Sequence, residues 1–465
     1  MTAAPRSPGG GSRQAGVTGA AGTARLVRAI GFWGLVAMCI NAVVGSGVFL
    51  LPGETYELLG PFSLWAPLLF ALPVFILVLC FAEAASHFKE PGGAFLYAGT
   101  AFGDFVGFET GWMNWLARIS SLAALANGFV LSLERIWAPA GETGVRAALI
   151  AGSLAALAAI HMAGVRYGAG TIYVLTIGKL LPLLFFIAAA LLVFRHNPIP
   201  ASFEIPGPGT DWSEAALFML FAYAGFENLG VPAGEYKDPR RDLPMALLVG
   251  IVGIALVYSL AQLAAMSVLP DLAGTGTPIA DAAGALLGPA GALLITVGAV
   301  ISILGTNSGT MLEGSRMLYA LSIGRRPYRL VSRVHERFRT PVVAIAIHAG
   351  VAIPLALGGT FARLAILSAV ARMTTYLFTA AAVPRLRRLR GPGELSPGFR
   401  TPGPWVPVLG TAIALALFLT LKRIHLLAAV VALVVGAVLW GLGRLFPGGE
   451  EPLTETAAER IEEEP

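Results

Sequence analysis

Charged residues are scarce in this chain of 465 residues. Asp, Glu, Lys and Arg together make up 13% of it, whereas soluble globular proteins carry about 25%. Hydrophobic residues make up 56%, and the mean hydropathy is +0.74. So few charges cannot cover the surface of a water-soluble protein of this length. The composition therefore excludes an ordinary soluble protein and predicts one that crosses a membrane many times.

Residues that carry catalytic or metal chemistry are also few. Cys39 and Cys80 both lie in apolar runs, where they are interpreted as packing residues rather than as a disulfide or a metal site. The histidines are scattered and lack metal-ligand spacing; they are His87, His161, His196, His335, His348 and His425. No phosphate loop of the Walker type occurs. The sequence therefore predicts no enzyme, no metal and no cofactor.

The two ends of the chain differ in composition from the apolar remainder. Residues 1–29 are rich in small and polar residues and are predicted to form a disordered tail, without a signal peptide. Residues 447–465 form an acidic tail. Residues 30–446 are interpreted as the transmembrane domain.

Apolar runs long enough to cross a bilayer recur through this domain. A bilayer core needs about 20 apolar residues per helix. The runs lie near residues 31–52, 62–86, 107–133, 146–163, 169–194, 213–233, 244–269, 284–312, 341–358, 361–384, 404–421 and 425–446. We therefore predict an all-α membrane protein with about twelve transmembrane helices.

The basic residues predict the orientation of these spans. With the N-terminus in the cytoplasm, 23 of the 32 Lys and Arg residues fall in cytoplasmic segments and 6 in external ones. Cytoplasmic loops of membrane proteins carry such an excess. Both termini are therefore expected in the cytoplasm, in a chain inserted in the cytoplasmic membrane. The high pI is explained by topology, so nucleic acid is not expected as a partner.

The first run holds the weakest helix formers near its middle. "NAVVGSGVFLLPG" (residues 41–53) contains Gly45, Ser46 and Gly47, and Gly costs a helix about 1 kcal/mol relative to Ala. Close helix packing is one explanation of such small residues. The other is an unwound segment, which would offer N–H groups to an anion and carbonyls to a cation.

A second interruption favours the unwound segment. "LFAYAGFENLG" (residues 220–230) carries Gly225 and the carboxylate of Glu227 inside the sixth run. Spans one and six enter from opposite sides, as expected for two inverted five-helix repeats. We predict repeat one over about 30–195 and repeat two over about 212–390. Two extra helices follow over about 404–446.

Three motifs resemble signatures of the amino acid–polyamine–organocation transporters. They are "VVGSGVFLLPG" (43–53), "FAYAGFEN" with "GEYKDPRRDLP" (221–228 and 234–244), and "GSRMLYALSIG" (314–324). The motifs follow the family's order and spacing. The resemblance implies a leucine-transporter-type fold that moves amino acids or related amines by alternating access.

The resemblance also implies a substrate site at the two breaks. The amides of Ser46 and Gly47 would take the substrate carboxylate. The carbonyls of Val43, Phe221 and Ala224 would take its amino group. Phe221 stands where relatives place an aromatic lid, although ordinary packing is the alternative. The predicted substrate-binding residues are Val43, Gly45, Ser46, Gly47, Phe221, Ala222, Ala224 and Gly225.

Lys179 and Glu227 are the candidates for coupling transport to protons. Lys179 lies mid-span without an acid in its own run, and burial disfavours its charged form. The resemblance implies the same role, because some proton-linked members have a lysine at this place. A fixed charge that bridges helices is the alternative for Lys179. For Glu227, a proton-linked role and a structural hydrogen bond both remain open.

Arg118 and Arg372 also fall within predicted spans. Arginine keeps its proton in proteins, so a structural role is expected for both. Their candidate partners are Glu83, Glu109 and Glu313, and the sequence does not assign the pairs.

These features predict a secondary active transporter that takes up a neutral amino acid with protons. An exchanger of amino acids or amines, or a carrier of polyamines or cationic amino acids, is the alternative. The expected partners are the small-molecule substrate, protons and the lipid bilayer. Nothing in the sequence identifies a partner subunit.

Overall fold

The structure is a computed structural model. It describes residues 30–88, 92–164, 169–193, 204–230, 236–269, 271–389 and 398–446. Over these ranges the chain forms helices and connecting loops, and they contain no β-strand. The predicted all-α class is therefore confirmed. The predicted tails at 1–29 and 447–465 lie outside the described residues.

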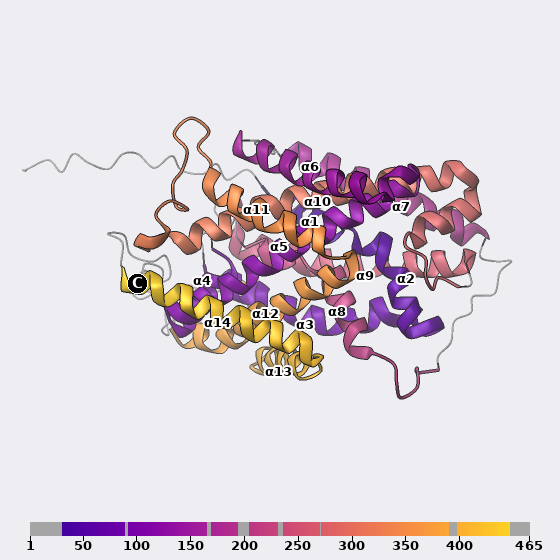
Figure 1. The fold of residues 1–465 in the computed structure, drawn as a ribbon. Helices are drawn as coiled ribbons and strands as arrows, with labels where there is room; N and C mark the ends of the chain where they lie inside the picture. Colours follow the sequence, from indigo (N-terminus) through magenta and orange to yellow (C-terminus); the bar gives the residue numbers. More distant parts are fainter. Residues whose placement is uncertain are drawn as a thin grey trace, which may run out of the picture.

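The α-helices follow one another along the whole domain (Figure 1). They are α1 (Phe32–Val43), α2 (Gly47–Leu59), α3 (Ala66–Ser86), α4 (Ala94–Phe102), α5 (Asp104–Glu134), α6 (Thr143–Met162), α7 (Ala169–Val193), α8 (Trp212–Tyr223), α9 (Pro239–Val268), α10 (Pro278–Ser322), α11 (Val342–Gly358), α12 (Phe361–Leu389), α13 (Trp405–Leu419) and α14 (Arg423–Leu445).

Many of these helices have the length and composition of membrane spans. Among the described residues, seven segments qualify: Gly47–Ser86, Asp104–Glu134, Thr143–Met162, Arg240–Val268, Pro278–Ser322, Phe361–Leu389 and Arg423–Leu445. Shorter apolar helices cover Phe32–Val43, Thr176–Leu192, Val342–Gly358 and Trp405–Leu419. A membrane protein with several spans follows from this. The count of twelve and the two inverted repeats stay predictions.

The predicted interruption of the first run is present. Helix α1 ends at Val43, Val44 takes an extended conformation, and α2 begins at Gly47. The sixth run is interrupted in the same way. Helix α8 ends at Tyr223, Ala224 is extended, and the 3-10 turn η4 (Phe226–Asn228) follows.

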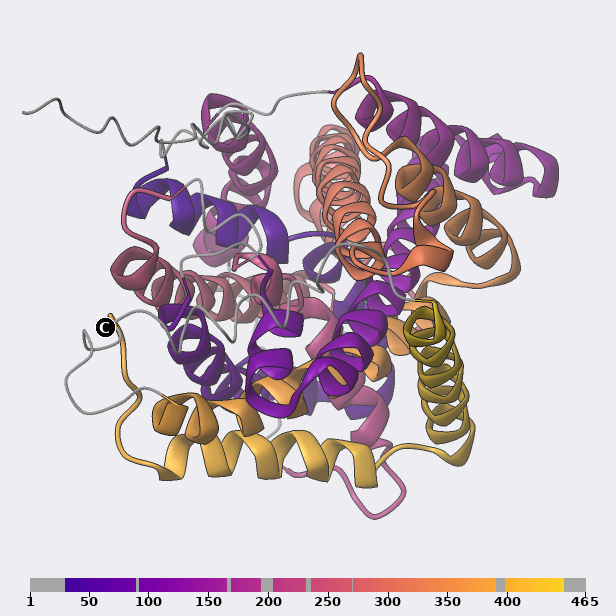
Figure 2. The ribbon, with the colours of Figure 1, turned by 90° about the vertical axis from the view of Figure 1, so that its left-hand side faces the viewer.

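Helix α5 lies at the centre of the packing, against α10, α11, α12 and α4. Helices α13 and α14 lie along one side of the molecule, and α6 and α7 lie along the opposite side (Figures 1 and 2). Helix α13 packs on α12 and α3, while α14 packs on α5. Helix α9 packs on α1, α10 packs on α2, and α12 packs on α8, so these three helices line the segments beside the breaks. The two C-terminal helices lie on the outside.

Two features of the helices were not predicted. Helix α4 is a short, buried helix that packs on α5 and α12 ahead of the third run. Helix α10 bends at Gly288, whose φ of +71° favours glycine. The bend divides α10 into a short first part and a long second part that continues to Ser322.

Candidate functional site

The two helix breaks lie against each other. A Cβ atom at Gly47 would lie 3.0 Å from the Cα of Ala222 in α8. A Cβ atom at Gly225 would lie 2.5 Å from the carbonyl oxygen of Ala42 in α1. Gly225 also has a φ of +130°, which other residues rarely adopt. Side chains at these two positions would push the breaks apart, so glycine allows them to meet.

The break between α1 and α2 gathers hydrogen-bond donors. The first N–H groups of α2 have no carbonyl one turn earlier to accept their hydrogen bonds. Ser46 occupies the N-cap position of α2, and its buried hydroxyl has no hydrogen-bond partner within the described ranges. Amide N–H groups at a helix N-terminus bind anions such as carboxylates. The predicted residues Gly45, Ser46 and Gly47 therefore stand together at a place suited to a carboxylate.

Carbonyl groups lie beside these donors. The hydroxyl of Tyr258 in α9 is 2.9 Å from the carbonyl oxygen of Ala222 and 3.3 Å from that of Val43. A hydroxyl has one proton to donate. Tyr258 therefore donates to one of these carbonyl oxygens at a time, and the other can still accept a hydrogen bond. Tyr258 was not predicted as a site residue, because it lies in α9, outside both motifs.

Two aromatic rings cover one side of the breaks. The ring of Phe221 meets that of Phe361, the first residue of α12, edge to face with centroids 5.9 Å apart. Gly128 in α5 lies beside this pair. A Cβ atom there would lie 3.5 Å from both Phe361 and Ser46 and 3.0 Å from Leu50. The predicted lid residue thus has an aromatic partner, which the sequence motifs did not identify.

Lys179 reaches the first break from α7. Its ammonium nitrogen lies 2.8 Å from the carbonyl oxygen of Val44 and 3.0 Å from that of Asn41. It also lies 3.2 Å from the hydroxyl of Thr306 in α10. The lysine side chain is fully buried. The carbonyls released at the break and a hydroxyl of the eighth run therefore surround this nitrogen.

Glu227 lies between two arginines. One of its carboxylate oxygens, Oε1, is 2.7 Å from Nη2 of Arg118 and 2.7 Å from Nε of Arg372. The other oxygen accepts a hydrogen bond of 2.8 Å from the amide of Gly225. Glu313 in α10 also pairs with Arg118, at 3.1 Å. The two arginines and two carboxylates balance in charge, so the group can lie inside the membrane.

The arginine partners correct part of the sequence prediction. Glu313 does pair with Arg118. Glu83 instead pairs with Arg387 at 2.6 Å, and Glu109 has no hydrogen-bond partner within the described ranges. Glu227, for which a proton-linked role and a structural hydrogen bond were both left open, is the main partner of both arginines. Spacing along the chain could not show this, because α5, η4 and α12 meet only in the folded protein.

Metal chemistry finds no support in the described parts of the chain. They contain no group of three or more His, Cys, Asp or Glu side chains arranged to hold a metal ion. Cys39 and Cys80 are separate, buried thiols. His161 instead forms a hydrogen bond of 2.9 Å with the hydroxyl of Ser308.

Comparison with known proteins identifies the family. The family model described as "Amino acid permease" matches residues 30–442. The chain belongs to the amino acid permease family. The resemblance found from the sequence motifs is therefore confirmed, together with a multi-pass membrane transporter as the kind of protein.

Three relatives from Bacillus subtilis (strain 168) illustrate the range of this family. The serine/threonine exchanger SteT is 28% identical, over 83% of this chain and 89% of its own length. The branched-chain amino acid permease BcaP is 26% identical, over 92% and 95%. A putative arginine/ornithine antiporter is 27% identical, over 68% and 74%. All three names describe transporters of amino acids, so membership indicates a transporter rather than an enzyme.

The first testable prediction concerns the buried carboxylate. Glu227→Gln leaves two buried arginines without their shared anion, and breaking a buried ion pair costs about 3–5 kcal/mol. We expect a lower midpoint in thermal unfolding of the detergent-purified protein. Glu313→Gln is the matched control, because its side chain is 27% exposed and it contacts only one of these arginines. Equal losses in the two variants would contradict the central position given to Glu227.

Proposed function

We propose that this amino acid permease takes up a neutral amino acid with protons, by alternating access around the two helix breaks. The observation that carries the proposal is the contact between the breaks, which brings N–H donors and carbonyl acceptors together. A zwitterionic amino acid needs both kinds of group. In this proposal the amides of Ser46 and Gly47 receive the carboxylate, and the carbonyls of Val43, Phe221 and Ala224 receive the amino group.

The charge balance beside the breaks supports a neutral substrate side chain. Glu227 and Glu313 are acids near the breaks, and each already pairs with arginine. A cationic side chain would have to compete with a buried guanidinium for either carboxylate. The aromatic pair of Phe221 and Phe361 supplies an apolar wall instead.

Lys179 is proposed as the coupling group. A neutral lysine can stay in an apolar site at little cost, whereas a charged one needs carbonyls around it. The carbonyls of Asn41 and Val44 come from the break itself. Movement of α1 away from α7 would remove them and release the proton. Substrate movement and proton transfer are then linked through one segment of backbone.

We also propose the membrane arrangement predicted from the sequence. It has twelve spans in two inverted repeats of five plus two, with both termini in the cytoplasm. The support is the excess of basic residues in the segments assigned to that side. The breaks in spans one and six would then be the equivalent points of the two repeats.

A binding screen tests the substrate. Purified protein is exposed to each of the twenty common amino acids and to polyamines, and thermal stabilisation is measured. We expect neutral amino acids to stabilise the protein and their decarboxylated amines to have little effect. Stabilisation by the amines alone would point to a polyamine carrier. Preloading liposomes with unlabelled substrate then separates exchange from symport, because only an exchanger needs the internal substrate.

The coupling role of Lys179 is tested in liposomes with a proton gradient. Lys179→Ala should abolish accumulation of substrate against its gradient while leaving some binding. Lys179→Met removes the charge and keeps most of the side-chain volume, so it should behave in the same way without a packing defect. Lys179→Arg, with a permanent charge, should not restore coupling. Accumulation by the Met variant at the rate of the unaltered protein would leave the lysine as a structural bridge.

The aromatic pair is tested by comparing binding with transport. Phe221→Ala should reduce transport at least tenfold and affinity much less, because the backbone groups that bind the substrate remain. Phe218→Ala is the control, since Phe218 is a buried ring one turn earlier in α8. That variant should lose stability without a selective loss of transport. Equal losses of binding and transport in Phe221→Ala would favour a packing role.

A further inference from the structure

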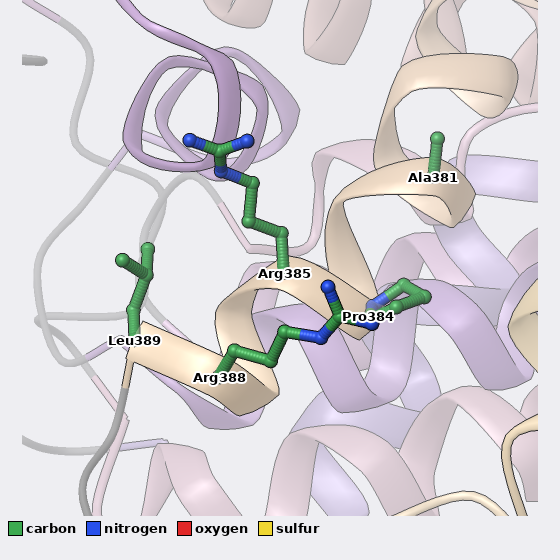
Figure 3. Close-up of a pocket in the computed structure, with 5 residues that line it drawn as sticks. All are labelled: Ala381, Pro384, Arg385, Arg388 and Leu389. Atoms are coloured by element: carbon green, nitrogen blue, oxygen red, sulfur yellow. The ribbon is translucent and has the colours of Figure 1, made fainter.

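A basic pocket lies at the C-terminal end of α12 (Figure 3). It has a volume of about 340 Å³ and is lined by Ala381, Pro384, Arg385, Arg388 and Leu389. Figure 3 shows both arginine side chains extending from the last turns of the helix, with Ala381 one turn earlier. The lining therefore combines two positive charges with apolar surface.

The arginines of the pocket differ from their neighbour Arg387. Arg387 is held by Glu83, with Nε–Oε1 at 2.6 Å, and donates to the carbonyl of Gly403 at 3.2 Å. Arg385 and Arg388 are exposed, and neither pairs with a carboxylate in the part of the chain that the structure describes. Their charges are therefore available to an anion from outside.

The segment that Arg387 contacts indicates where the pocket lies relative to the membrane surface. Two residues after Gly403 comes Trp405, the first residue of α13, and its side chain is 57% exposed. Exposed tryptophans gather where lipid headgroups meet the hydrocarbon. The pocket thus lies at headgroup level, on the side where the sequence places most of the basic residues.

Apolar surface continues from the pocket toward the membrane interior. Phe378 lies seven residues before Arg385, on the same face of α12 and about 10 Å deeper. Its ring packs against that of Phe102, with centroids 6.4 Å apart, and Phe102 is itself 37% exposed. An amphiphile with an anionic head and an apolar chain matches this order of charge and apolar surface.

We propose that this pocket binds an anionic phospholipid, with its phosphate at Arg385 and Arg388 and an acyl chain along Ala381 and Phe378. Basic pockets between helices at the cytoplasmic face recognise such headgroups. The acidic segment of the sequence that contains Glu450 and Glu451 is another anion that the chain offers. It has no acyl chain to cover the apolar strip, so the lipid is the better match.

Helix α12 connects the pocket with the breaks. The same helix carries Arg372, which holds Glu227, and Phe361, which meets Phe221. An anchored cytoplasmic end restrains the position of the whole helix. Transport is therefore expected to be faster in membranes that contain anionic lipid. The binding site itself does not depend on which substrate is moved.

Native mass spectrometry of the full chain tests the site. The protein is titrated with phosphatidylglycerol or phosphatidylcholine of matched chain length. We expect a clear preference for the anionic lipid, which falls about tenfold or more in the double variant R385Q/R388Q. R385K/R388K, which keeps the charges, should retain part of the preference. R329Q/R333Q is the matched control, because it removes two exposed cytoplasmic arginines outside the pocket.

Each remaining outcome would overturn the proposal. An equal loss of the preference for anionic lipid in R329Q/R333Q would mean that the lipid is attracted by surface charge in general and not by a defined site. Displacement of the lipid by inorganic phosphate at millimolar concentration would mean a site for free anions. Anionic-lipid binding that appears only after removal of residues 447–465 would mean that the acidic tail occupies the pocket. No preference in the unaltered protein would leave no lipid site at all.

Discussion

The carboxylate of Glu227 is the interaction on which the rest of the site depends. It accepts a hydrogen bond from the amide N–H of Gly225, a group that the interrupted helix leaves without a partner. It also meets Arg118 from α5 and Arg372 from α12. One buried anion therefore holds three segments of the chain at a single point. Without it, the break in α8 would leave unpaired polar groups inside the membrane, where each is costly.

At the first break, Lys179 has the role that Glu227 has at the second, with the opposite charge. Its nitrogen lies against carbonyls that α1 no longer uses in its own helix. Each break thus has a charged side chain of the sign that its free groups attract: an anion for an amide N–H and a cation for carbonyls. The backbone between these two centres is left to meet a substrate. The pairing of each break with a charged side chain explains why buried charges lie beside the helix breaks in a chain that has few charged residues.

The sequence predicted those features that depend on local chemistry. Gly45, Gly47 and Gly225 indicated where the helices stop, since a weak helix former acts on its own segment. Lys179 was found because a lone charge in an apolar run is costly wherever it lies. The role of Glu227 as the shared partner of Arg118 and Arg372, and the ring of Phe361 opposite Phe221, could not be predicted. They depend on which helices pack together, and no periodicity within one span contains that information.

The close approach of Gly225 to Ala42 has a mechanical consequence. The two segments are packed too closely to leave room for a methyl group between them. We therefore expect the end of α1 and the segment after α8 to move together. An added methyl group at Gly225 would act as a wedge in this joint and would disturb both helices at once.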